Sequence, residues 1–120
     1  SRVSPAKDAL DAGLVYNFHT DTPVVKPDML HAVWTAVNRV TRSGRVIGED
    51  QRISAYDALK GITINAAYAY FEEDSKGSIK EGKRADLVVL DANPLKVDPM
   101  AIKDIKILET IKDGVTVFTA

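Results

Sequence analysis

The sequence contains no cysteine and only two histidines, His19 and His31. The missing cysteines exclude disulfide bonds, thiolate metal sites and cysteine nucleophiles. Two histidines in one copy of the chain are too few for a metal site built from three or more imidazoles. The lack of cysteine does not fix the cellular compartment, and we favour the cytoplasm only as a default expectation.

The chain also has no excess of charge and no long apolar run. Lys and Arg number 16 against 17 for Asp and Glu, which gives a net charge of -1. Such a chain has no strong positive field to attract nucleic acid or anionic lipid, and the small cluster of Arg39, Arg42 and Arg45 is followed at once by acidic residues. No apolar stretch approaches the roughly 20 residues that a membrane-spanning helix needs. We therefore predict neither a nucleic-acid partner nor a membrane partner.

What is present is an ordinary globular composition. The 120 residues are 45% hydrophobic and 28% charged, which suits a folded domain or a part of a larger one. Up to about residue 71 the chain is rich in helical patterns. Apolar residues recur at helical spacing over 28–41, and a capping-box pattern starts another helix at Ser54. Short β-rich runs then follow at 85–91 and 105–118, the latter with an Asp-Gly pair typical of a hairpin turn.

A short apolar run at 14–18 is followed by a cluster of polar residues. The run is apolar throughout, which favours a buried strand of a parallel sheet. Directly after it come, in order, His19, Thr20, Asp21, Thr22 and Pro23. Polar side chains at the end of a buried strand are where α/β proteins place their chemistry. Asp21 is therefore a candidate functional residue, although an Asp before Thr-Pro is also typical of a turn that its side chain caps.

Three residues of the predicted helices are explained by structure rather than by chemistry. Trp34 falls on the apolar stripe of helix 28–41, which predicts a place in the core. His31 falls beside that stripe, which predicts a solvent-exposed or helix-capping role. Gly61 lies inside the helix that starts after Ser54, and we expect close packing against a neighbouring element to be the reason for it.

Three segments, in this order along the chain, resemble the C-terminal end of a metal-dependent amidohydrolase. Residues 11–24 resemble the last barrel strand of that family with its Asp-x-Pro-Val ending, and residues 54–67 resemble the final barrel helix with its Thr-x-Asn-x-Ala core. Residues 77–91 are similar to the Gly-Ser-Ile-x-x-Gly-Lys-x-Ala-Asp-Leu-Val-Val-Leu-Asp signature of the branch called amidohydrolase family 3. That branch includes N-substituted formamide deformylases and proteins named as regulators of exoenzyme production.

The resemblance implies a fold larger than this chain. Members of the family are a (β/α)8 barrel plus a small β-sandwich built from both chain ends. We therefore predict an α/β fragment in two parts. Residues 1–75 would form the last strand and helices of the amidohydrolase barrel, and residues 76–120 the C-terminal strands of the composite β-sandwich.

The resemblance also implies a role for Asp21. The equivalent aspartate binds a divalent metal, for which we expect zinc, and takes a proton from the metal-bound water. The family's other metal ligands lie on earlier strands, outside this sequence, so we expect Asp21 to bind metal and act in catalysis only in the intact enzyme. The chain alone is expected to bind no metal and to be inactive. We expect His19, Thr20 and Thr22 to line the pocket or to orient Asp21, with direct metal contact by His19 as the alternative.

Two functions remain open at this point. The first is the C-terminal part of a hydrolase that cleaves carbon–nitrogen bonds other than peptide bonds in a small amide-type substrate. The second is a stand-alone regulatory or protein-interaction module derived from a hydrolase tail. In either case the helices lack the barrel wall on which they would pack. We therefore expect the partner to be the remainder of the barrel or a second copy of the chain.

Overall fold

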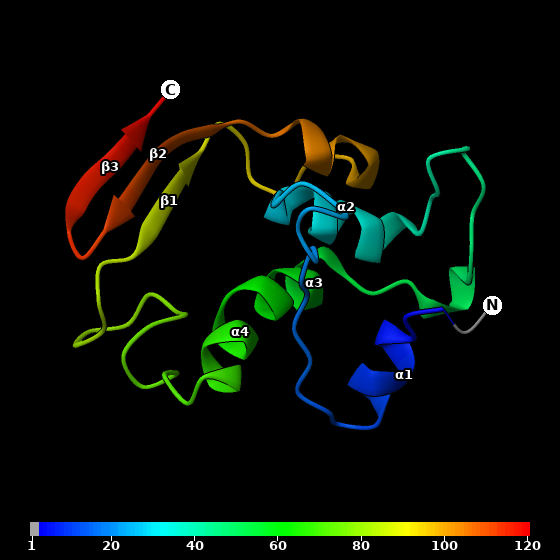
Figure 1. The fold of residues 1–120 in the computed structure, drawn as a ribbon, viewed down its shortest axis with the longest axis horizontal. Coiled ribbons are helices and arrows are strands. Elements are labelled where there is room, and N and C mark those ends of the chain that lie inside the picture. The colour runs from blue at the N-terminus through cyan, green and yellow to red at the C-terminus, as the bar shows by residue number, and fades with distance from the viewer. Residues whose placement is uncertain (1–2) are drawn as a thin grey trace.

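The computed structural model describes residues 3–120, and Figure 1 shows how the helices give way to strands along the chain. Within residues 3–120, no helix has the length and apolarity needed to cross a bilayer. The elements in chain order are α1 (Ala6–Asp11), α2 (Met29–Asn38), η1 (Glu49–Gln51), α3 (Ala55–Ile62), α4 (Ile64–Ala69), β1 (Leu87–Leu90), η2 (Pro99–Asp104), β2 (Ile107–Lys112) and β3 (Val115–Thr119), where η marks a 3-10 helix.

Helix α2 forms where the helical spacing predicted it, but it is shorter. The Asp28 carboxylate caps its start by accepting a hydrogen bond from the N–H of His31 at 3.0 Å. The helix ends at Asn38 rather than near residue 41, because Arg39 adopts the left-handed conformation with φ 58°. Trp34 is only 6% exposed, which confirms its predicted place in the core.

The helix predicted from Ser54 is present but interrupted. The hydroxyl of Ser54 accepts a hydrogen bond from the N–H of Asp57 at 3.0 Å and donates one to the Asp57 carboxylate at 2.7 Å. The cap is therefore confirmed, although the carboxylate binds the cap hydroxyl rather than the cap amide. At Thr63 the backbone leaves the helical region, with φ -123° and ψ -98°, and this break separates α3 from α4.

The three strands form one antiparallel sheet in the order β1-β2-β3. The turn between β2 and β3 has positive φ at Asp113 (50°) and Gly114 (79°), so the Asp-Gly hairpin is confirmed. The carboxylate of Asp86 accepts a hydrogen bond from the N–H of Asp113 at 2.8 Å, which fastens this turn to the start of β1. Seven apolar residues of the sheet remain at least 41% exposed, namely Val88, Val89, Ile107, Leu108, Val115, Val117 and Phe118.

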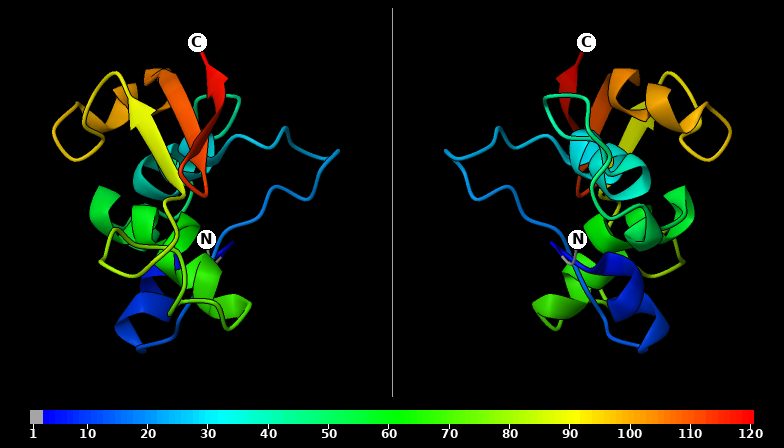
Figure 2. Two further views of the ribbon diagram at one scale, coloured as in Figure 1. Left: turned by 90° about the vertical axis from the view of Figure 1, so that its left-hand side faces the viewer. Right: turned by 90° about the vertical axis from the view of Figure 1, so that its right-hand side faces the viewer.

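The prediction of a buried parallel strand at 14–18 is wrong for this structure. These residues are extended, but they pair with no strand among residues 3–120, and Leu14 and Val15 are 63% and 54% exposed. A strand needs neighbours for its backbone hydrogen bonds, and the three strands of the described part of the chain pair with one another. The run therefore lies in an open segment between α1 and α2 (Figure 2).

The core lies where α2, α3 and η2 meet (Figure 1). Ile102 of η2 is completely buried there. The indole N–H of Trp34 donates to the carbonyl of Met100 at 3.0 Å, and the side-chain amide of Asn38 donates to the carbonyl of Pro99 at 2.9 Å. These contacts anchor the C-terminal part of the chain on α2.

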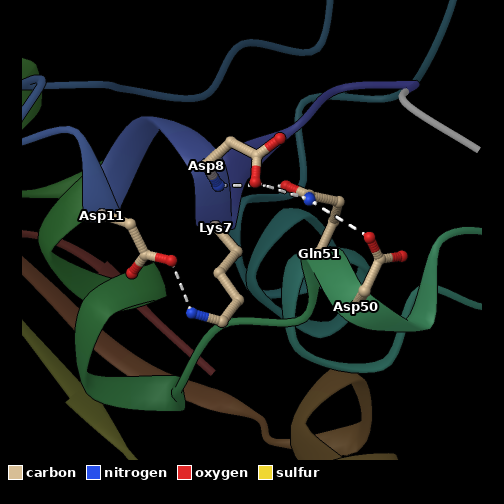
Figure 3. A network of polar contacts seen from close by, with 5 residues as sticks. All are labelled: Lys7, Asp8, Asp11, Asp50 and Gln51. Carbon is tan, nitrogen blue, oxygen red and sulfur yellow. Dashed lines mark hydrogen bonds and ion pairs between the residues drawn. The ribbon is translucent and has the colours of Figure 1, made fainter.

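A polar network joins α1 to η1 (Figure 3). The side-chain amide of Gln51, which is 3% exposed, accepts a hydrogen bond from the N–H of Asp8 at 3.1 Å and donates one to the Asp8 carboxylate at 3.0 Å. Beside it, the hydrogen bond from Lys7 to Asp11 at 2.7 Å raises the pKa of Lys7. These groups satisfy one another, so the network holds the two elements together rather than offering a binding site.

Candidate functional site

The predicted site residues lie on a segment that projects from the body of the molecule between α1 and α2 (Figure 2). Asp21 is exposed and has φ 51°, and its carbonyl accepts a hydrogen bond from the N–H of Val24 at 2.8 Å. The hydroxyls of Thr20 and Thr22 are 3.2 Å apart, and Thr22 also donates to the carbonyl of Val25 at 3.2 Å. The threonines therefore brace the turn that presents Asp21.

The carboxylate of Asp21 takes no part in this turn. Among residues 3–120 it accepts no hydrogen bond and forms no ion pair, and the turn is closed by the backbone carbonyl of Asp21. The alternative explanation, an Asp whose side chain caps the turn, is therefore not what this structure contains. Asp21 therefore combines a left-handed backbone with an exposed carboxylate that has no partner within residues 3–120.

The base of the projecting segment is fixed on α3. The N–H of Phe18 donates to the carbonyl of Gly61 at 3.4 Å, and a Cβ on Gly61 would lie only 2.8 Å from the Phe18 ring. The close packing expected at Gly61 is thus confirmed. Nearby, the hydroxyl of Tyr16 donates to the carbonyl of Asp57 at 3.2 Å, and burial, assisted by the negative charge of Asp57, raises the pKa of Tyr16.

A cleft of about 380 Å³ lies between this segment and one face of α2. His19 and Thr20 line it from the segment, whereas Asp21 and Thr22 do not. His31 lines it from α2, where its ring stacks on Trp34 with the centroids 5.5 Å apart. The cleft therefore brings the two histidines of the chain to one cavity.

Sequence reasoning placed His31 correctly at an exposed, non-core position of α2, but it missed the cleft. A signal existed in the sequence. Besides the apolar stripe, α2 and its flanks carry a second helical stripe of small and polar residues, namely Asp28, His31, Ala32, Thr35, Ala36 and Arg39, and all of these line the cleft. What the sequence did not reveal is that residues 18–20 and Val25, at the base of the projecting segment, line a cleft together with this stripe.

The described residues do not make a metal site by themselves. Within residues 3–120, no group of three or more His, Asp or Glu side chains is arranged to hold a metal ion. A catalytic zinc site uses three protein ligands and an open position, and Asp21 with His19 would supply at most two of them. The chemistry of Asp21 suits a divalent metal, but the donor set of this chain is incomplete.

The arginine cluster noted in the sequence is also divided in the structure. Arg39 donates to the carbonyls of Ile47 and Ser4 at 3.0 and 2.8 Å and to that of Val3, so its guanidinium holds the N-terminal segment against α2. Arg42 lines the cleft, and Arg45 does not. The three side chains therefore have different surroundings and do not form one basic surface.

The structure thus places an exposed aspartate on a loop near a small cleft, and within residues 3–120 no set of side chains is arranged to hold a metal ion around it. Residues 1–118 match the amidohydrolase family over almost the entire chain, so the chain belongs to that family.

Individual relatives agree with the family match. The chain is 35% identical to an N-substituted formamide deformylase from Arthrobacter pascens over 114 residues, which is 95% of this chain and 21% of that protein. It is 36% identical to an imidazolonepropionase from Treponema denticola over 92 residues, 74% of this chain and 20% of that protein. The chain thus spans about a fifth of the length of these curated relatives.

Among solved structures, too, this chain matches one part of a longer amidohydrolase. An amidohydrolase from Thermotoga maritima superimposes with a TM-score of 0.69 and 30% sequence identity. The superposition covers 96% of this chain and 26% of that structure. The fold of these residues is therefore that of one part of an amidohydrolase, with the three-stranded antiparallel sheet as its β component.

Proposed function

We propose that this chain is the C-terminal part of a metal-dependent hydrolase that cleaves carbon–nitrogen bonds other than peptide bonds in small amide-type substrates. The family match supports the hydrolase class, and the similarity to an N-substituted formamide deformylase supports a formamide or related amide as substrate. The single observation that carries the proposal is the exposed Asp21 carboxylate, which has no partner among residues 3–120, at the tip of its braced turn.

In this proposal residues 1–75 complete a (β/α)8 barrel and residues 76–120 complete a small β-sandwich. A divalent metal, which we propose to be zinc, would supply Lewis-acid chemistry in the intact enzyme. Asp21 would give that site one carboxylate ligand and would accept a proton at its other oxygen. Thr20 and Thr22 would orient Asp21 by holding its turn, and His19 would line the substrate pocket.

The test is the hydrolysis of N-substituted formamides by the full-length protein, followed as formate release. Asp21→Asn keeps the size of the side chain but removes its charge and its basicity, so we expect kcat to fall about 10²- to 10⁴-fold. Asp74→Asn, at another exposed aspartate, is the matched control and should keep full activity. Full activity of Asp21→Asn would contradict the proposal, as would stoichiometric zinc bound by the 120-residue chain alone with submicromolar affinity.

The second candidate is a stand-alone regulatory or protein-interaction module, and the exposed apolar sheet favours it. The two candidates differ in the size of the native polypeptide. If this chain is part of a hydrolase like its relatives, an immunoblot of source cells should show a polypeptide of about five times the mass of this chain. A band near 13.1 kDa would instead favour the interaction module.

A further inference from the structure

We propose that the cleft between α2 and residues 18–28 binds the N-substituent of the substrate, and that Arg42 selects substituents that end in a carboxylate. This assignment rests on the proposed hydrolase function, because it names the substrate class of that same enzyme. It goes further in giving a role to a helix face and to an arginine that the reaction itself does not require.

The walls of the cleft suit an apolar group. On α2, Ala32 and Ala36 are one helical turn apart, and their small side chains leave space along the helix. Phe18 and Val25 line the cleft from the projecting segment. The volume of about 380 Å³ is at the small end of the range for ligand pockets, which suits a short chain or a single ring.

The two ends of the cleft differ in charge. Asp28 lies at the start of the helix and Arg39 and Arg42 follow its end, and ten residues of helix separate these charges by about 15 Å. A carboxylate is repelled at the first end and attracted at the second. Two full positive charges outweigh the partial negative charge of the helix C-terminus, so the end with Arg39 and Arg42 is the one that would bind the carboxylate.

Arg42 is the residue of this pair that is available for a ligand. The guanidinium of Arg39 already donates to three backbone carbonyls. Arg42 makes no hydrogen bond or ion pair through its side chain within residues 3–120, while its backbone is held in a closed turn. In that turn the N–H of Gly44 donates to the carbonyl of Thr41 at 2.9 Å, and the N–H of Thr41 donates to the carbonyl of Arg45 at 2.8 Å.

The cleft also lies next to the proposed reacting group. His19 and Thr20 line it, and they precede Asp21 by two residues and by one. A substituent held in the cleft would therefore extend toward the turn that carries the Asp21 carboxylate. Holding a remote part of the substrate in this way positions the bond to be cleaved.

The experiment compares two probes on the full-length protein, N-formyl-6-aminohexanoate and its neutral carboxamide. We expect the wild type to have the lower KM for the carboxylate probe. Arg42→Gln should raise that KM about fivefold, leave the KM for the carboxamide unchanged and leave kcat unchanged for both. Arg45→Gln is the matched control, because Arg45 belongs to the same turn but does not line the cleft, and it should keep the preference.

Binding is measured separately from turnover, by following the imidazole signals of His31 by NMR as the carboxylate probe is added. We expect shifts at His31 in the wild type and in Arg45→Gln, with about fivefold weaker binding in Arg42→Gln. Absence of shifts at His31, or equal binding by Arg42→Gln, would overturn the assignment of the cleft even if both probes are hydrolysed. If no formamide or amide is hydrolysed, the proposed function fails, and the titration still decides whether the cleft binds the probe.

Discussion

The hydroxyl of Tyr16 connects the projecting segment to α3 and makes the stability of that contact depend on pH. Burial raises the pKa of Tyr16 above its usual value of 10.0, and the charge of Asp57 adds to the rise. The folded chain therefore holds this proton more tightly than the unfolded chain does. The stability that the neutral phenol contributes is complete below the unfolded pKa and is lost as the pH rises through the folded pKa.

We therefore predict that the free energy of unfolding of the wild type falls more steeply between about pH 9 and about pH 12 than that of Tyr16→Phe. Urea titrations of both chains across this range measure the difference. Lysines titrate in both proteins and cancel in the comparison. Parallel curves for the two chains would show that the phenol of Tyr16 is equally acidic in the folded and unfolded states.

Gly61 is a second residue at which the packing of the segment can be tested. A methyl group there would lie 2.8 Å from one carbon of the Phe18 ring and 3.1 Å from another. Gly61→Ala gains about 1 kcal/mol in helix propensity but must displace the ring, and we expect a net loss of about 1–2 kcal/mol. Thermal unfolding measures it. In a Phe18→Leu background the loss should largely disappear, and equal losses in the two backgrounds would exclude the predicted clash.

At the scale of elements, the junction between α2 and η2 fixes the C-terminal part of the chain on α2. The side-chain amide of Asn38, which is 6% exposed, donates to the carbonyls of Trp34 and Pro99, both at 2.9 Å. Asn38→Leu keeps the volume but leaves the Pro99 carbonyl without this donor, so we expect a loss of about 1–3 kcal/mol in the free energy of unfolding. Asn17→Leu, at an exposed asparagine, is the control and should change it by less than about 0.5 kcal/mol.

The elements that sequence patterns predicted well are those whose signals are local. The stripe of α2, the cap at Ser54 and the hairpin at 113–114 depend on residues within a few positions of one another. The run at 14–18 has equally clear apolar character, but a strand exists only beside other strands, and among residues 3–120 no strand lies beside this run. The cleft depends on residues of the projecting segment lying beside α2, which no local pattern specifies.

The same distinction applies to the candidate site. The sequence singled out Asp21 by its position after an apolar run, and the structure adds that its carboxylate is unengaged within residues 3–120. The role of Asp21 in metal binding and catalysis stays a prediction, because residues 3–120 do not arrange the other ligands that such a site would need. A site assembled from several strands is visible in one segment only as an incomplete set of donors.

At the scale of the whole molecule, most apolar side chains of the sheet are exposed. All five residues of β3 are exposed, and the side chains of Val115 and Val117 are 64% and 60% accessible. Apolar surface of this kind is normally covered, either by another part of the same protein or by a partner. A free edge strand adds backbone groups that can pair with a second chain.

We predict that the isolated 120-residue chain self-associates through this sheet, whereas a longer protein that covers the sheet does not. Sedimentation velocity over a range of concentrations should show a species heavier than the 13.1 kDa monomer for the isolated chain. Replacing both Val115 and Val117 with Thr keeps the β propensity of β3 but reduces its apolar surface, so the variant should shift toward the monomer. Thr116→Ser, on the opposite face of the same strand, is the control. A wild-type chain that stays monomeric at all concentrations and unfolds in one sharp transition would instead indicate an autonomous domain whose sheet tolerates exposure.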